Sequence, residues 1–129
     1  MRVVGSLFAV VAAVILTGCS EDSASGPTLN VGGSSGGATI TITGSGVSPR
    51  NVTIARGAQV TFLNNDSRTH DIRSDSHPGH GDCPEINQVG LIQPGNNRQT
   101  GNLTTVRTCG FHDESDASDA AFQGTIQIQ

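Results

Sequence analysis

The chain has 129 residues, a formal net charge of −4 and no lysine, so arginine supplies its only fixed positive charges. This balance argues against nucleic acid or an anionic lipid surface as a partner, because both attract basic proteins. Its four aromatic residues are all phenylalanine. A core must therefore be built mainly from Val, Ile and Leu, and such a core favours strands.

Residues 1–18 are predicted to be an export leader. Arg2 precedes an apolar run from Val3 to Leu16, which is too short to span a bilayer and ends in small residues. The ending "LTGC" resembles a bacterial lipobox, in which the cysteine is lipidated after cleavage, so we expect Cys19 to anchor the protein to a membrane. A leader cut nearby would instead leave Cys19 as a thiol or a disulfide partner. Either route places the protein in the cell envelope, on a periplasmic or extracellular face.

Residues 19–37 are predicted to be the lipidated cysteine and a flexible linker. The segment is rich in Gly and Ser and lacks an apolar period, so it cannot bury enough surface to offset chain entropy. Residues 38–129 remain, which are enough for one domain with one core.

Within 38–129, short runs alternate apolar and polar residues and are rich in β-branched side chains, a pattern typical of half-buried strands. Turn sequences such as "GSG" at Gly44 and "QPGNN" at Gln93 separate them, and no long amphipathic helical window is present. We therefore predict an all-β fold, a Greek-key antiparallel β-sandwich. The predicted strands are 38–43, 51–55, 59–64, 70–73, 104–109 and 124–129.

Two polar segments interrupt this pattern, and loops on a rigid sandwich are where a site is expected. Residues 74–87 contain His77, His80 and Cys83, spaced three apart. We interpret this segment as a solvated insertion, with the alternative that these side chains converge on a second metal or add ligands to a first. The other segment, residues 113–120, is an acidic loop directly after His112.

Three further residues have an arrangement suited to copper. His70 begins one predicted strand, and Cys109 and His112 flank the turn expected after another. Imidazoles and a thiolate suit a copper ion that changes oxidation state, because thiolate favours the reduced ion and imidazole suits both forms.

These residues lie in segments that resemble the cupredoxins, the plastocyanin-like blue copper proteins. The resemblance rests on "VSPRNVTIARGAQVTFLNND" before His70, on "CGFH", and on the closing "FQGTIQIQ". It implies a cupredoxin-like sandwich, a copper cofactor held by His70, Cys109 and His112 in a type 1 site, and electron transfer without an enzymatic activity. It also implies that an Asn at 64 or 65 ties the two ligand loops together.

The usual axial Met of that family is missing, because the only methionine is Met1 in the leader. Phe122 occupies its place, with Gln123 beside it. If Phe122 points inward, the copper should be nearly three-coordinate, with a raised reduction potential; a Gln123 ligand should lower the potential.

Cys109 has two other interpretations. Outside the cytoplasm, a pair of cysteines is by default a disulfide, and a Cys83–Cys109 bond would remove the thiolate. A Cys109–His112 nucleophile would need an orienting acid and an oxyanion pocket. Asp113 is adjacent to His112, but neighbouring residues in extended chain face apart, and no catalytic acid/base pair is evident.

These alternatives give three functions. The first is an electron carrier at the membrane, with electrons entering at His112 and a redox partner, such as a cytochrome, presenting a basic patch to the acidic loop. The second is a copper-scavenging or delivery module that joins Cys83 to Cys109. Its ligands would be His70, His77, His80 and His112. The third is a metal-free interaction domain.

Overall fold

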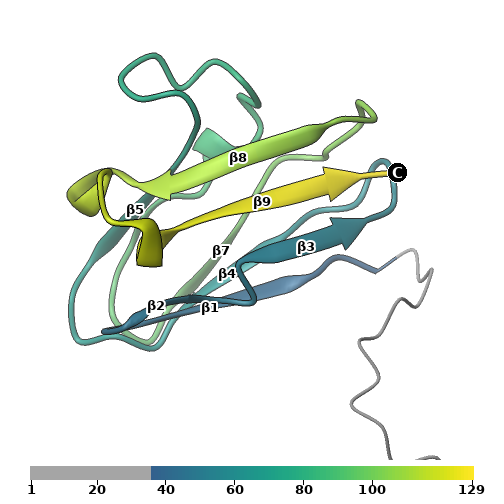
Figure 1. Cartoon of the computed structure of the whole chain (residues 1–129). Helices are drawn as coiled ribbons and strands as arrows, with labels where there is room; N and C mark the ends of the chain where they lie inside the picture. Colours follow the sequence, from purple (N-terminus) through teal and green to yellow (C-terminus); the bar gives the residue numbers. More distant parts are fainter. Residues whose placement is uncertain (1–35) are drawn as a thin grey trace, which may run out of the picture.

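The computed structural model describes residues 36–129, which form two β-sheets packed face to face (Figure 1). One sheet has the strand order β2 (Gly46–Ser48), β1 (Thr39–Thr43), β4 (Thr61–Asn64), β7 (Asn97–Gln99). The other has the order β3 (Asn51–Ile54), β9 (Gln123–Ile128), β8 (Thr108–Asp113), β5 (His70–Ser74), β6 (Gly90–Ile92). The predicted leader, Cys19 and the linker up to residue 35 lie outside the described residues.

The predicted all-β sandwich is confirmed, but its sheets are mixed and not purely antiparallel. Strand β1 pairs in parallel with β4, and β3 pairs in parallel with β9. Helical structure within residues 36–129 is limited to the short 3₁₀ turns η1 (Ile86–Gln88), η2 (Glu114–Asp116) and η3 (Ala120–Phe122). None of the helices in this part of the chain is long and apolar enough to cross a membrane.

The predicted strands differ most from the structure at β8. The alternating run from Thr104 predicted a strand that ends at Cys109, whereas β8 begins at Thr108 and continues to Asp113. Strands β2, β6 and β7 were not predicted, because three residues are too few for a period of two to be recognised.

Alternate residues of the strands fill the space between the sheets. Ile40 and Ile42 of β1 are fully buried, and Phe62 of β4 meets Phe111 of β8 edge to face, with ring centroids 5.1 Å apart. Such aromatic pairs add about 0.5–1.5 kcal/mol beyond the area that they bury. The core therefore fixes β8 firmly in the middle of its sheet.

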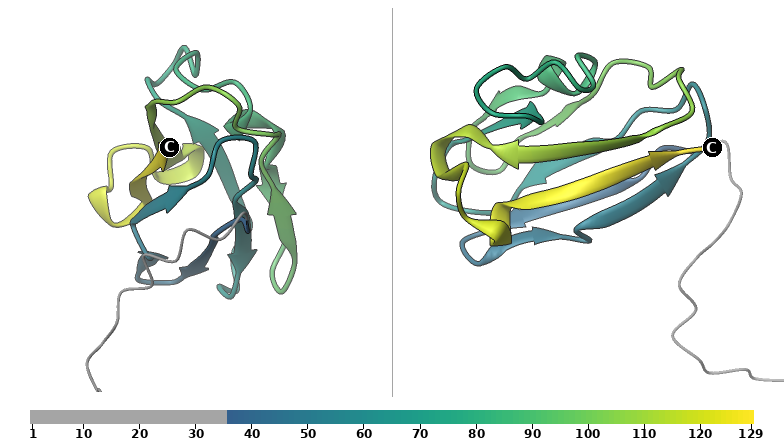
Figure 2. Two further views of the ribbon diagram at one scale, coloured as in Figure 1. Left: turned by 90° about the vertical axis from the view of Figure 1, so that its right-hand side faces the viewer. Right: turned by 45° about the horizontal axis from the view of Figure 1, so that its top comes forward.

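The two faces of β8 have different surroundings. Its pairing with β9 is regular from Thr108 to His112, so successive side chains alternate between faces. Cys109 and Phe111 belong to the buried core, whereas His112 contacts Asp75 of the loop that follows β5. Figures 1 and 2 show this loop lying over the β5–β8 part of the sheet.

Candidate metal centre

Cys109 is joined to Cys83 by a disulfide, with Cα atoms 5.9 Å apart and both residues fully buried. This corrects the expected thiolate ligand, because a sulfur bonded to a second sulfur cannot bind copper as a thiolate. It also removes the Cys109 nucleophile. In addition, Cys109 and His112 are three residues apart in a regular strand, so their side chains lie on opposite faces. The structure therefore does not bring the His70, Cys109 and His112 set together.

His70 has carboxylates at both ring nitrogens. Its Nδ1 donates to Asp113, which is fully buried, and its Nε2 lies 3.0 Å from Asp66 Oδ2. The Phe122 ring stacks on His70, with centroids 5.4 Å apart, and Gln123 Nε2 donates to the Ala117 carbonyl. His70, Phe122 and Gln123 are thus engaged in packing and hydrogen bonds, which does not support them as an equatorial ligand and its axial neighbours.

The loop before His70 is held by two polar side chains. Buried Asn64 donates to the carbonyls of Arg68 and Ile92 and accepts from the Asp66 amide, so it ties this loop to β6. Desolvation alone would raise the pKa of Asp66, but hydrogen bonds from His70, Arg68 and the Ser67 amide outweigh it and lower that pKa to about 2. Asp66 is therefore ionised near neutral pH and can hold the His70 ring in place.

A second group of side chains lies close enough together that it could hold a metal ion. One potential ligand atom from each of four residues lies within 4.8 Å of the others, and we call this group the histidine–glutamate cluster. Its members are His77, His80, His112 and Glu114. The loop after β5 supplies two histidines, β8 supplies the third, and η2 supplies the glutamate. Much of residues 74–87 is exposed, as the interpretation of a solvated insertion expected. The alternative, in which this segment supplies metal ligands, is supported for His77 and His80, whose rings lie near His112, and not for Cys83, which is in the disulfide.

Hydrogen bonds outside the cluster orient two of its rings. Nδ1 of His80 donates to the Ser74 carbonyl at 3.0 Å, and Nδ1 of His112 donates to Asp75 Oδ1 at 2.6 Å. A neutral imidazole has a single N–H, so Nε2 of each ring carries a lone pair. Both Nε2 atoms lie 3.3 Å from Glu114 Oε2, as does Nδ1 of His77. Several electron pairs therefore converge on one small volume.

The charge of Glu114 suits such a centre. Desolvation would raise the pKa of Glu114, but hydrogen bonds with His112 and His77 and the charges of His77 and His80 lower it. The carboxylate is thus ionised near neutral pH. When a metal displaces the ring protons that face it, this carboxylate and the nitrogens of the three rings provide the ligands that a divalent cation requires.

The backbone of His80 is also unusual. It has a φ of 48°, a left-handed conformation that non-glycine residues adopt rarely and that occurs often at functional sites. Three hydrogen bonds hold it there: its amide donates to Ser76, its carbonyl accepts from Asn87, and its ring donates to Ser74. The loop therefore maintains an unfavourable backbone conformation that places this ring in the cluster.

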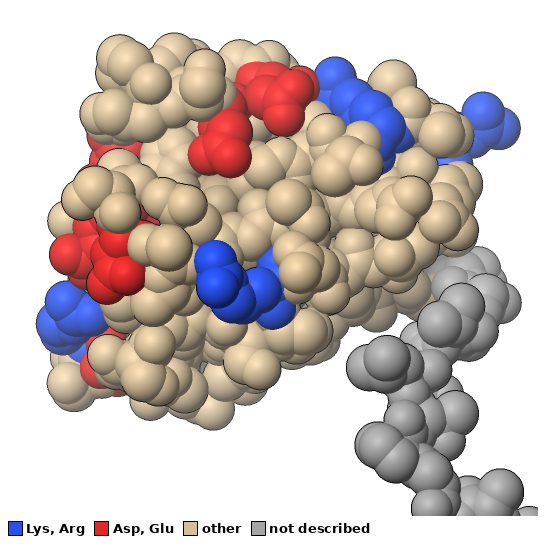
Figure 3. Space-filling model, viewed as in Figure 1, with Lys and Arg blue, Asp and Glu red and all other residues tan. Residues whose placement is uncertain are grey.

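The acidic loop after His112 is largely engaged within the domain. Asp113 binds His70, Glu114 belongs to the cluster, and Asp116 lies 3.3 Å from Arg68. Asp119 accepts from the Ala121 amide. In Figure 3, acidic side chains occupy the left-hand end and the top of the domain, with basic side chains beside them. This arrangement does not favour the loop as a docking site for a basic redox partner.

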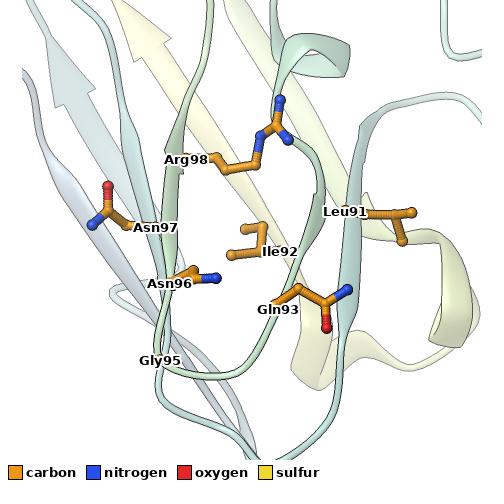
Figure 4. Close-up of a pocket in the computed structure, with 7 residues that line it drawn as sticks. All are labelled: Leu91, Ile92, Gln93, Gly95, Asn96, Asn97 and Arg98. Carbon is orange, nitrogen blue, oxygen red and sulfur yellow. The ribbon is translucent and has the colours of Figure 1, made fainter.

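A separate hollow lies between Leu91 and Arg98, at the edges of β6 and β7 (Figure 4). Its lining is mostly amide and aliphatic, and Arg98 is the one charged side chain. Neither histidine nor a carboxylate lines it, so it lacks the ligands of a metal centre.

No family model and no curated protein matches this chain. Its fold, however, is similar to that of several solved copper proteins. A purple cupredoxin from Nitrosopumilus maritimus aligns with a TM-score of 0.55 and 19% identity, over 71% of this chain and 99% of that one. The oxidised plastocyanin of Dryopteris crassirhizoma aligns with a TM-score of 0.55 and 18% identity, over 70% of this chain and 99% of the plastocyanin. Auracyanin from Roseiflexus castenholzii aligns with a TM-score of 0.55 and 14% identity, over 76% of this chain and 99% of the auracyanin.

These identities are low and the coverage of the known domains is nearly complete, so the likeness concerns the fold. It agrees with the two-sheet arrangement and with the predicted cupredoxin-like sandwich. Residues 36–129 therefore have a cupredoxin-like fold.

Proposed function

We propose that this protein binds cupric copper at the histidine–glutamate cluster and acts as a copper-capturing or delivery module of the cell envelope. The observation that carries the proposal is the convergence of His77, His80, His112 and Glu114, with ligand atoms within 4.8 Å of one another. The Cu(I) named in structures of amicyanin, a protein of similar fold, is consistent with it. Of the alternatives drawn from the sequence, it corresponds to the scavenging module without His70.

The ligand types favour Cu²⁺ over Cu⁺. Three imidazoles and a carboxylate contain no sulfur, and sites of nitrogen and oxygen bind Cu²⁺ more tightly than other divalent first-row metals. A type 1 electron carrier is less well supported, because its thiolate is in a disulfide. The His77 side chain is 51% exposed, so the cluster is open to solvent on one side, which suits uptake and release of a metal.

The proposal predicts one Cu²⁺ per chain, bound without strong copper–thiolate absorption. His80→Asn should weaken binding by more than about 100-fold, since it removes a ligand and not just an outer-shell partner. Asn is among the residues that tolerate a left-handed backbone, so this variant should keep the fold. Calorimetric titration with Cu²⁺, and with Zn²⁺ for comparison, measures both affinities.

His70→Gln is the control for loss of a histidine outside the cluster, and its copper binding is compared in folded protein because the variant also breaks the buried pair with Asp113. If folded His70→Gln loses copper as His80→Asn is expected to, the proposed centre is wrong. A wild-type protein that binds no Cu²⁺ would favour the metal-free interaction domain.

We further propose that Cys19 carries the lipid that holds this module at the membrane, with residues 20–37 as the tether. The "LTGC" sequence supports this, as does the position of the domain after a linker. Cys19→Ser should move the expressed protein from the membrane fraction to the soluble fraction and remove the mass of the lipid. An unmodified Cys19 in the wild-type protein would contradict the anchor.

A further inference from the structure

Asp75 contacts His112 at the ring nitrogen that does not face the cluster. Its Oδ1 accepts from His112 Nδ1 at 2.6 Å, while Nε2 of the same ring lies 3.3 Å from Glu114. Both ring nitrogens face a carboxylate, but Asp75 is the nearer of the two, so its hydrogen bond keeps the proton of a neutral imidazole on Nδ1. Nε2 is then the atom with the free electron pair, and it faces the other ligands.

We propose that Asp75 is a positioning residue of this metal centre, which fixes the tautomer and the orientation of His112. The inference rests on the proposed function, and it concerns a residue that does not itself bind the metal. Carboxylates that accept from the second nitrogen of a ligating histidine typically fix its orientation and make it more basic.

Asp75 is well placed to act on His112, because its own backbone is tied to the same strand. Its amide donates to the Gly110 carbonyl at 3.0 Å, and its carbonyl accepts from the Asp82 amide at 2.9 Å. Gly110 and His112 are two residues apart in β8 and so lie on one face. The backbone of Asp75 is therefore held beside this face, and its half-exposed side chain reaches His112 from there.

Gly110 provides the space that this carboxylate needs. A Cβ atom at position 110 would overlap Oδ2 of Asp75. Gly110→Ala should therefore displace the Asp75 side chain without removing any polar group from the protein. This gives an independent way to separate Asp75 from His112.

The rings of His77 and His80 differ in whether a group outside the cluster accepts a hydrogen bond from them. The Ser74 carbonyl orients His80, as Asp75 orients His112, whereas exposed His77 contacts Glu114 alone through Nδ1. A side-chain substitution cannot remove a backbone carbonyl. Asp75 is therefore the outer group of this centre that mutagenesis can test directly.

Asp75→Ala in the full chain is expected to reduce Cu²⁺ affinity about 10–100-fold, the usual cost of losing an outer-shell partner. Asp75→Asn keeps an acceptor oxygen and should recover most of the affinity. Gly110→Ala should behave like Asp75→Ala. The electron paramagnetic resonance spectrum of bound Cu²⁺ should change in both affected variants, which a loss of global stability alone would not produce.

Asp82→Ala is the matched control. It removes the same charge from the same loop, and the Asp82 carboxylate reaches only the Gly110 amide, at 3.4 Å. Its copper affinity and spectrum should equal those of the wild type. If Asp75→Ala and Asp82→Ala lose copper affinity equally, the effect comes from removing a negative charge and not from the contact with His112, and the proposal is overturned.

Nitrogen NMR of the metal-free protein tests the positioning without copper. His112 should carry its proton on Nδ1 in the wild type and should populate both tautomers in Asp75→Ala. An unchanged tautomer overturns the role of Asp75 even if the wild type binds copper. Correct tautomers in a wild type that binds no Cu²⁺ would instead overturn the proposed function, and the metal-site role of Asp75 with it.

Discussion

Replacing Asp113 by alanine is expected to lower the free energy of unfolding by about 3–5 kcal/mol, the usual cost of removing one partner of a buried pair. Asp113 is fully buried, and its carboxylate accepts from the His70 ring and from the amides of Asp71 and Ser115. The variant leaves the buried Nδ1 of His70 without its acceptor, and a buried unsatisfied group costs about 1–3 kcal/mol. Urea denaturation followed by circular dichroism measures the change.

Asp116→Ala provides the comparison for this prediction. Asp116 lies in the same loop, but its ion pair with Arg68 is exposed, and such pairs contribute about 0–1 kcal/mol. If Asp113→Ala lowers the free energy of unfolding as little as Asp116→Ala does, the buried pair of His70 and Asp113 does not stabilise this end of the sandwich.

Replacing Cys83 and Cys109 together by alanine is expected to cost about 3.5 kcal/mol, from the chain entropy of the loop that the disulfide closes. The two residues are separated by 26 positions, and the bond links the loop that carries His77 and His80 to the strand that carries His112. Copper affinity should therefore fall as well, because the cluster is less well ordered. Denaturation of the oxidised and reduced wild type should give the same difference.

The single variant Cys83→Ala separates the two interpretations of Cys109. It frees the Cys109 thiol, but that thiol lies on the face of β8 opposite to His112. We therefore expect copper-loaded Cys83→Ala to lack the strong visible absorption of a copper–thiolate bond. A blue protein would restore the set of His70, Cys109 and His112 that the resemblance implied.

Local sequence patterns predicted the fold class, because strand alternation depends on neighbouring residues. The runs at Ile40, Phe62 and Ile126 identify β1, β4 and β9, and these residues are fully buried in the structure. The parallel pairings were not predictable in this way, since a period of two gives the faces of a strand but not its neighbours.

The site was predicted only in part. Three members of the cluster, His77, His80 and Glu114, lie in the two segments expected to hold a site, and His112 directly precedes the second of them. The spacing of His77 and His80 in "HPGH" was a usable signal. The choice of Cys109 as a ligand failed because "CGFH" was read as a turn. These four residues are part of strand β8, so Cys109 faces the core and His112 faces the loop that follows β5.

The sequence by itself therefore determined the fold class, most of the longer strands and the set of metal-binding side chains, since each follows from local composition and spacing. Only the tertiary structure decided which of them meet. The partner of a cysteine or a histidine depends on sheet register and on the path of a loop, and contacts between segments far apart in the chain set both. Here those contacts join Cys109 to Cys83, His70 to Asp113, and His112 to the histidines of the β5 loop.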